Sequence, residues 1–241
     1  MIFAAGLGTR LRPLTDTLPK ALVPLNGTTL LEYQIRMLRK AGIDDIVVNV
    51  HHFPDQIIDF LRRHDNFGCR IRVSDERDEL LETGGGLWHA FENKMPDEPV
   101  LVCNVDILSN IDLNAFLGSL QPEDIGRLVV SERKTQRYLC FDEEDRLVGW
   151  KNIQTGEQRL SDGRHLAFSG MSLLRPEVFP LLKQYAADRG PRFSLIDFLL
   201  AIAPAHVLRA YVPIDYRMMD VGKFDLMSEA EAFARDFVRG A

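Results

Sequence analysis

A glycine-rich segment with two cationic side chains directly follows the first apolar run of the chain. It reads Gly6-Leu7-Gly8-Thr9-Arg10-Leu11-Arg12-Pro13-Leu14-Thr15 and continues to Pro19-Lys20. Glycines let main-chain N–H groups face phosphate oxygens, and Arg10 and Lys20 are donors suited to the charge of a triphosphate. We therefore interpret this segment as an anion-binding loop.

The loop matches neither of the two most familiar nucleotide motifs. A dinucleotide-binding fingerprint would have a third glycine where Leu11 stands, and a P-loop would have Gly-Lys-Ser or Gly-Lys-Thr. Both classes are therefore disfavoured.

Two carboxylates from distant segments are candidates for binding a cation. Asp106 ends an apolar strand predicted over residues 100–105, and ligands of open α/β sheets bind at such strand ends. An aspartate there is by itself more often a helix cap or a turn former. Asp220 also follows a strand-like segment and precedes Gly222. Brought together, the two carboxylates would suit a hard divalent cation such as Mg²⁺.

The surrounding pattern predicts the elements that position these residues. Apolar runs of strand length alternate with helical periodicity, which is typical of βαβ units around a mainly parallel sheet. Strands are predicted at residues 1–5, 46–50, 69–73, 100–105, 128–131, 138–141, 147–150, 167–174 and 207–212. Helices are predicted at residues 29–42, 54–63, from 87 onward, 194–203 and 225–238. The strands on either side of the acidic turn 142–145 indicate an antiparallel extension.

A second glycine run, Thr83-Gly84-Gly85-Gly86, precedes the helix predicted from near Leu87. Its glycines would permit positive φ and close approach of the backbone to a ligand. The same glycines would also serve a tight connection, so the run alone does not decide between the two.

The composition of the chain limits which binding partners and which cellular compartment we expect for the protein. A net charge of -6 argues against a nucleic-acid-binding protein, which usually carries a basic face. The three cysteines are widely spaced, without metal-ligand spacing, and we expect reduced thiols in a cytoplasmic protein. No apolar run approaches the roughly 20 residues of a membrane span. The chain opens directly on an apolar run, so a few residues are expected to be missing upstream.

The anion-binding loop resembles the signature of the sugar-1-phosphate nucleotidyltransferases, Gly-x-Gly-Thr-Arg-x-x-Pro-Leu-Thr followed by Pro-Lys. Four further motifs follow in the family's order, namely Glu82-Thr83-Gly84-Gly85-Gly86, Val102-Cys103-Asn104-Val105-Asp106, Phe168-Ser169-Gly170 and Met219-Asp220-Val221-Gly222. The resemblance covers nearly the whole chain. Within the family, the Glu82-Thr83-Gly84-Gly85-Gly86 stretch is most similar to that of bacterial N-acetylmuramate 1-phosphate uridylyltransferases and the related mannose 1-phosphate guanylyltransferases.

The resemblance implies a fold and a reaction. The fold would be a three-layer α/β/α, Rossmann-like (GT-A-like) domain over residues 1–241, with a mixed, mainly parallel sheet and a small antiparallel insertion. Residues 1–110 would mainly bind the nucleotide and residues 111–241 the sugar phosphate. The sugar phosphate would attack the α-phosphorus of a nucleoside triphosphate in line and release pyrophosphate, assisted by Mg²⁺. The protein would be a monomer or a homodimer without membrane or nucleic-acid partners.

The resemblance also implies site residues. Arg10 would contact the β- and γ-phosphates, Lys20 would lie near the α-phosphate, and Asp106 and Asp220 would hold the metal. The nucleotide would be bound by Ala4, Ala5, Gly6, Gly8, Thr9, Asp75, Glu76, Gly84, Gly85 and Asn104. The sugar phosphate would be bound by Lys151, Asn152, Gly170 and Lys223. Lys223 departs from the family, which often has threonine there.

Three alternatives stay open. A glycosyltransferase would normally present Asp-x-Asp after the strand, whereas Ile107 and Leu108 follow Asp106. A cytidylyltransferase acting on phosphocholine would share the loop and the metal pair. An inactive nucleotide-sensing subunit would not need the whole phosphate and metal set. The base, the sugar, the pathway and the oligomeric state are not identified by the sequence.

Overall fold

The computed structural model describes residues 1–222 and 227–239. The chain forms two compact units. The first unit is built from three separate stretches, Met1–Leu80, Cys103–Asn110 and the described residues from Arg217 on. The second unit comprises Leu81–Val102 and Ile111–Tyr216.

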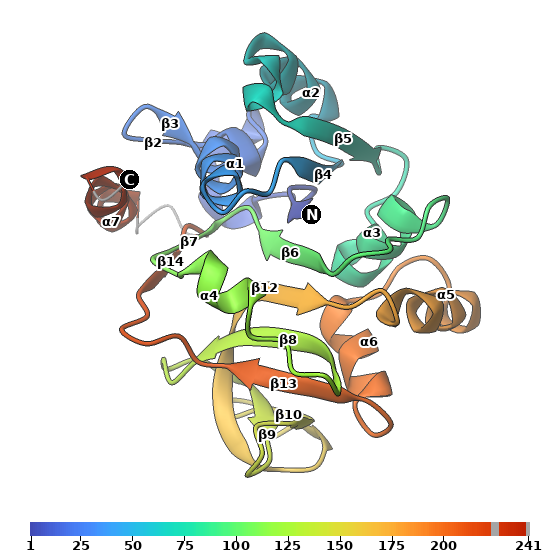
Figure 1. The fold of residues 1–241 in the computed structure, drawn as a ribbon. Helices are drawn as coiled ribbons and strands as arrows, with labels where there is room; N and C mark the ends of the chain where they lie inside the picture. The colour runs from blue at the N-terminus through green and yellow to red at the C-terminus, as the bar shows by residue number, and fades with distance from the viewer. Residues whose placement is uncertain (223–226, 240–241) are drawn as a thin grey trace. The chain divides into compact units, whose positions relative to one another are not determined.

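The first unit contains a parallel sheet in the order β6-β1-β4-β5 (Figure 1). In register, Ile2 of β1 lies between Val48 of β4 and Cys103 of β6. The strands are β1 (Ile2–Phe3), β4 (Asp45–Val50), β5 (Arg70–Asp75) and β6 (Val100–Asn104), the last of which begins in the second unit. Two short antiparallel pairs accompany the sheet, β2 (Pro24–Leu25) with β3 (Thr28–Thr29), and β7 (Ile107–Ser109) with β14 (Met218–Asp220).

The first unit has three helices in its described residues, and two of them begin at residues that favour a helix start. They are α1 (Leu30–Lys40), α2 (Pro54–Arg63) and α7 (Met227–Arg239). Thr29 caps α1 by accepting a hydrogen bond from the Glu32 amide (3.2 Å), and Pro54 opens α2. The apolar face of α1, including Leu31, Ile35 and Leu38, is fully buried, as its periodicity predicts.

The second unit holds the predicted antiparallel extension. Its strands run in the order β11-β10-β9-β12-β8-β13, and only β13 pairs in parallel with its neighbour. They are β8 (Asp124–Ser131), β9 (Arg137–Phe141), β10 (Leu147–Asn152), β11 (Gln158–Leu160), β12 (Arg164–Leu174) and β13 (Val207–Tyr211). The helices are α3 (Glu82–Phe91), α4 (Leu113–Leu117), α5 (Val178–Arg189) and α6 (Leu195–Ile202), of which α3, α5 and α6 contact one another (Figure 1).

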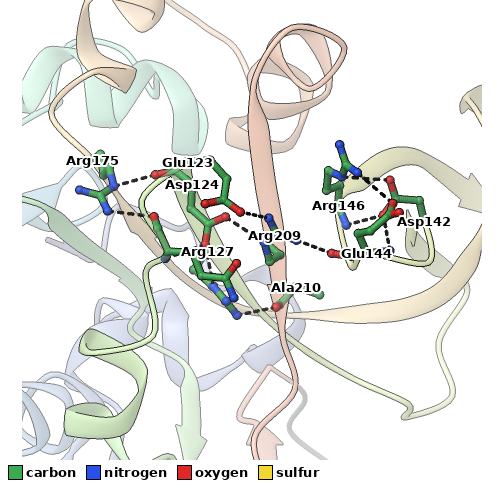
Figure 2. Close-up of polar contacts among 10 residues, drawn as sticks. Glu123, Asp124, Arg127, Asp142, Glu144, Arg146, Arg175, Arg209 and Ala210 are labelled. Atoms are coloured by element: carbon green, nitrogen blue, oxygen red, sulfur yellow. Dashed lines mark hydrogen bonds and ion pairs between the residues drawn. The ribbon is translucent and has the colours of Figure 1, made fainter.

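An ion network centred on the buried Asp124 joins two strands and a turn of this unit (Figure 2). Asp124 of β8 is fully buried and accepts hydrogen bonds from Arg127 (3.0 Å) and from Arg209 of β13 (2.9 Å). Arg209 also donates to the Glu144 carbonyl (2.5 Å) in the turn between β9 and β10. The network therefore fixes that turn to the β8–β13 pair.

The fold is thus mixed α/β with a largely parallel central sheet, as predicted. None of the helices in the described part of the chain has the length and apolar character needed to cross a lipid bilayer.

Candidate active site

The anion-binding loop leaves β1 and is held in a folded-back conformation. Gly8 has φ +65°, a conformation that favours glycine, and a Cβ there would lie 2.8 Å from Thr15 Cγ2 and 3.1 Å from Lys20 Cβ. The buried Thr15 hydroxyl donates to the Gly8 carbonyl (2.8 Å). The loop therefore brings Gly8, Thr15 and Lys20 together without room for a side chain at position 8.

Lys20 meets Asp106 in a close ion pair between Nζ and Oδ2. Both side chains are largely shielded, with 10% of Lys20 and 17% of Asp106 exposed. Lys20 comes from a short 3₁₀ turn, and Asp106 follows β6 at the carboxyl end of the parallel sheet. The structure therefore brings these two predicted site residues into direct contact.

Asp220 is brought beside Asp106 by backbone pairing. In the β7–β14 pair, Asp220 lies opposite Ile107, the residue after Asp106, and the Val221 amide donates to the Asp106 carbonyl (2.8 Å). At Gly222, a Cβ would lie 2.5 Å from Asp220 Oδ1 and 2.8 Å from Arg10 Nη2. The structure therefore gathers Arg10, Lys20, Asp106 and Asp220 in the first unit, although they are up to 210 positions apart.

A buried polar network lies at the end of β1. Asn49 Oδ1 accepts from the Ala4 amide (2.7 Å), and Asn49 Nδ2 donates to Glu76 Oε1 (2.7 Å). Glu76 is 3% exposed, whereas its exposed neighbour Asp75 accepts from Arg77 (2.8 Å). Of the two predicted base-binding carboxylates, Glu76 lies in this network.

Sequence reasoning missed Asn49, and two adjacent histidines support the loops nearby. Asn49 stands among the buried apolar residues of strand β4, a signal that could have marked it. His51 Nδ1 lies 2.6 Å from the Glu76 carbonyl, and His52 Nε2 lies 3.2 Å from the Thr15 carbonyl. Adjacent histidines thus contact different segments and hold the loops that border β1.

The second glycine run differs from its prediction. Helix α3 begins at Glu82 rather than near Leu87, so the glycines are part of the helix, and the residue with positive φ is Glu82 (63°). The amides of Gly84 and Gly85 both donate to the Phe193 carbonyl, at 3.0 and 3.1 Å. A Cβ on Gly85 would overlap the Pro191 carbonyl. Close packing against residues 191–193 therefore accounts for the lack of a side chain at Gly84 and Gly85 and uses both of their amides.

The other predicted nucleotide-binding residues lie along the first unit. Ala5 is buried, Gly6 and Thr9 are exposed in the loop, and Asn104 is half-buried at the end of β6, opposite Phe3.

The predicted sugar-phosphate residues lie in the second unit, except Lys223, which falls outside the described residues. Lys151 Nζ contacts the Asp162 carboxylate. Asn152 Oδ1 accepts from the amides of Gln154 (3.0 Å) and Thr155 (3.3 Å), so Asn152 shapes the turn after β10. Gly170 has φ +70° where the register of β12 against β8 shifts.

Known proteins resemble this chain over most of its length. Residues 1–201 match the profile of the MobA-like NTP transferase domain. The N-acetylmuramate alpha-1-phosphate uridylyltransferase of Caulobacter vibrioides is 33% identical over 208 residues, which cover 78% of this chain and 84% of that protein. The enzyme with the same name from Neisseria meningitidis serogroup B is 35% identical over 182 residues, covering 74% and 76%.

A solved structure has the same fold as this chain. A Bacillus anthracis protein assigned as a glucose-1-phosphate thymidylyltransferase matches with a TM-score of 0.82 at 18% identity, covering 98% of this chain and 94% of that one. At this identity the likeness concerns the fold alone.

Proposed function

This chain belongs to the family of MobA-like NTP transferase domains, and from that premise we propose that it condenses a nucleoside triphosphate with a sugar 1-phosphate and releases pyrophosphate. The observation that carries the proposal is the convergence of Arg10, Lys20, Asp106 and Asp220, two cations and two carboxylates, around the folded-back loop. A triphosphate and its counter-ion need this set of charges.

The substrates that we propose first are UTP and N-acetylmuramate 1-phosphate. The support is the function of the two uridylyltransferases, which this chain matches at 33% and 35% identity over more than two thirds of their lengths. The product would be a nucleotide-activated sugar.

A magnesium ion fits the carboxylates at the β7–β14 pair. Asp106 and Asp220 supply the hard oxygen donors that Mg²⁺ prefers, and the backbone bond from Val221 to Asp106 keeps their main chains adjacent. When bound, the ion would neutralise charge on the triphosphate and polarise its phosphoryl oxygens.

The side chains of the first unit would then align the reaction. Arg10, beside Gly222, would hold the β- and γ-phosphates and stabilise charge on the leaving pyrophosphate. Lys20, fixed by Asp106, would lie near the α-phosphate and reduce the repulsion between the two anions. The attacking oxygen belongs to a phosphate that is already ionised, so no general base and no covalent intermediate are required.

The remaining nucleotide-binding residues are assigned in residues 1–110, and the sugar-phosphate-binding residues in residues 111–241. We assign nucleotide binding to Ala4, Ala5, Gly6, Gly8, Thr9 and Asn104, and contact with the base to Glu76 in preference to Asp75, because Arg77 occupies Asp75. Sugar-phosphate binding is assigned to Lys151 and Gly170. A cytoplasmic location agrees with three cysteines that are free and buried.

The test is pyrophosphate release from a matrix of substrates, with and without Mg²⁺. UTP, GTP, CTP, dTTP and ATP are each combined with N-acetylmuramate, mannose, glucose and N-acetylglucosamine 1-phosphates and with phosphocholine. We expect a metal-dependent signal for UTP with N-acetylmuramate 1-phosphate. A signal only for CTP with phosphocholine would identify the cytidylyltransferase alternative, and nucleotide binding without turnover would identify a sensing subunit.

A further inference from the structure

A polar cluster surrounds Lys151 on one face of the antiparallel sheet in the second unit. In register, Lys151 of β10 lies opposite Tyr138 of β9, and His165 of β12 lies opposite Cys140 of β9. Since Tyr138 and Cys140 are two residues apart on one strand, all four side chains share a face. Asp162, from the short loop that precedes β12, joins them.

The two carboxylate oxygens of Asp162 have different partners. Oδ2 contacts Lys151 Nζ. Oδ1 accepts from the Gly163 amide (2.9 Å), lies 2.6 Å from His165 Nε2 and accepts from the Cys140 thiol (3.8 Å). One oxygen is therefore fixed by the surrounding protein, and the other is directed at the lysine.

The ionisation of the cluster agrees with this arrangement. The hydrogen bond from Lys151, followed by that from His165, holds the pKa of Asp162 well below its usual range. Burial, followed by the charge of Asp162, raises the pKa of Cys140 to about 11. The carboxylate is thus charged and the thiol protonated at neutral pH, as the observed hydrogen bonds require.

The same side chains do not favour a metal ion. Cys140, Asp162 and His165 place their ligand atoms within 4.8 Å of one another, a set that zinc can use. Zinc would need the thiolate of Cys140, whose pKa is raised, so the thiol would first have to lose a proton that the folded protein favours. The cation of this cluster is therefore the Lys151 ammonium.

We propose that Asp162 is a positioning residue that fixes the Lys151 ammonium for the phosphate group of the sugar 1-phosphate. A lysine head group sits on a flexible four-carbon stem and is held by a partner only when that partner is itself fixed. Asp162 meets this condition through Gly163, His165 and Cys140. The inference rests on the proposed function, in which Lys151 binds the sugar phosphate.

The test compares Asp162→Asn with Asp145→Asn. Both aspartates are 46% exposed and form an ion pair, Asp145 with Arg164 at 2.8 Å, so the control removes a similar carboxylate elsewhere in the same unit. We expect Asp162→Asn to raise the KM for the sugar 1-phosphate about tenfold, the usual effect of losing a hydrogen bond to a charged group, with the KM for the triphosphate unchanged. Asp145→Asn is expected to change neither.

A second measurement does not depend on activity. The rate at which an amine reagent modifies Lys151, followed by mass spectrometry, should rise in Asp162→Asn and not in Asp145→Asn. An unchanged labelling rate, or an unchanged or lower KM for the sugar 1-phosphate, would overturn the proposal. Absence of wild-type turnover on every substrate pair would count against the proposed function, and the labelling rate would then decide alone whether Asp162 holds Lys151.

Discussion

At the scale of single residues, Asp106 has two separate roles. Its carboxylate pairs with Lys20, and its carbonyl accepts from the Val221 amide next to Asp220. The side chain therefore orients a cation, while the backbone fixes the second carboxylate nearby. Because the backbone contact survives a substitution at position 106, the second carboxylate should stay in place, while the shielded Lys20 ammonium loses its anion.

Asp106→Asn and Asp220→Asn should each lower kcat by at least about 100-fold, since each removes a charged ligand of the proposed metal. Pyrophosphate release under saturating substrates measures the loss, and circular dichroism checks the fold. Asp59→Asn, at a 47% exposed carboxylate paired with Arg62, is the matched control and should retain the wild-type rate. A near-normal Mg²⁺-dependent rate in either variant would disprove the metal assignment.

The packing around Gly85 leaves no room for a side chain. Its substitution by alanine would place Cβ against the Pro191 carbonyl, so the chain near residue 191 must move. Overpacking of this kind costs about 1–3 kcal/mol, which exceeds the gain of up to about 1 kcal/mol from alanine in a helix.

Urea denaturation should accordingly show Gly85→Ala to be less stable than wild type. Gly6→Ala is the control, because among the described residues beyond its chain neighbours no atom lies within 4 Å of a Cβ at position 6. Equal stability of the two variants would mean that residues 191–193 can move away from the new Cβ without lowering the free energy of unfolding.

At the scale of elements, the ion network around Asp124 acts across strands that are distant in sequence. Arg127 links Asp124 of β8 to the Ala210 carbonyl of β13 (3.0 Å), and Arg209 extends the network to the turn between β9 and β10 (Figure 2). Burial would lower the pKa of Arg209, but the hydrogen bond and charge of Asp124 outweigh it and raise that pKa. Arg209 therefore stays charged.

Asp124→Asn should reduce the free energy of unfolding by about 3–5 kcal/mol, because it leaves two shielded guanidinium groups without their shared anion. Glu144→Gln is the comparison, since Glu144 is 61% exposed and its pairing with Arg146 should contribute under about 1 kcal/mol. Chemical denaturation of both variants gives the two values. Similar small losses in both would show that the network contributes little beyond solvent-exposed pairs.

The observed bounds of the helices and strands show which elements could be predicted from sequence patterns alone. The long periodic segments α1 and α2 and the hairpin of β9 and β10 were predicted close to their observed limits. Helix α5 was missed because Pro180 interrupts the pattern, yet proline is tolerated in a first turn, where its missing N–H has no helical partner. The two-residue strands β2 and β3 are too short for alternation to be visible.

At the scale of the whole molecule, all three cysteines are free and buried. Burial is the main cause that raises the pKa of Cys103 and Cys140 from about 9 to about 11. Because the unfolded thiols ionise first, the folded state loses stability as pH rises from about 9 and the loss levels off above about 11.

The free energy of unfolding should therefore fall between pH 8 and pH 10.5, and the fall should be smaller in a Cys103→Ala, Cys140→Ala variant. Urea denaturation at the two pH values measures both slopes, and the difference between them removes the contribution of tyrosines and lysines. Identical slopes would show that these thiols ionise as readily in the folded state as in the unfolded one.

The family and the mixed α/β fold predicted from the sequence are confirmed. The order of the motifs indicated which residues are candidates for the site, but not which contacts position those residues. Asn49 and Asp162 went unnoticed because a polar residue in a strand and an aspartate in a short loop have many uses, and only tertiary contacts reveal their partners. The roles of the site residues stay predictions.

The first unit is assembled from separated stretches of chain, and this affects how the gene should be cloned. The family profile ends at residue 201, whereas β13, β14 and Asp220 all come later. An expression clone that stopped at the profile boundary would lose a proposed metal ligand and leave β8 without its parallel partner, an exposed edge that invites aggregation. Such a clone would yield an insoluble, inactive protein and suggest wrongly that the enzyme does not work.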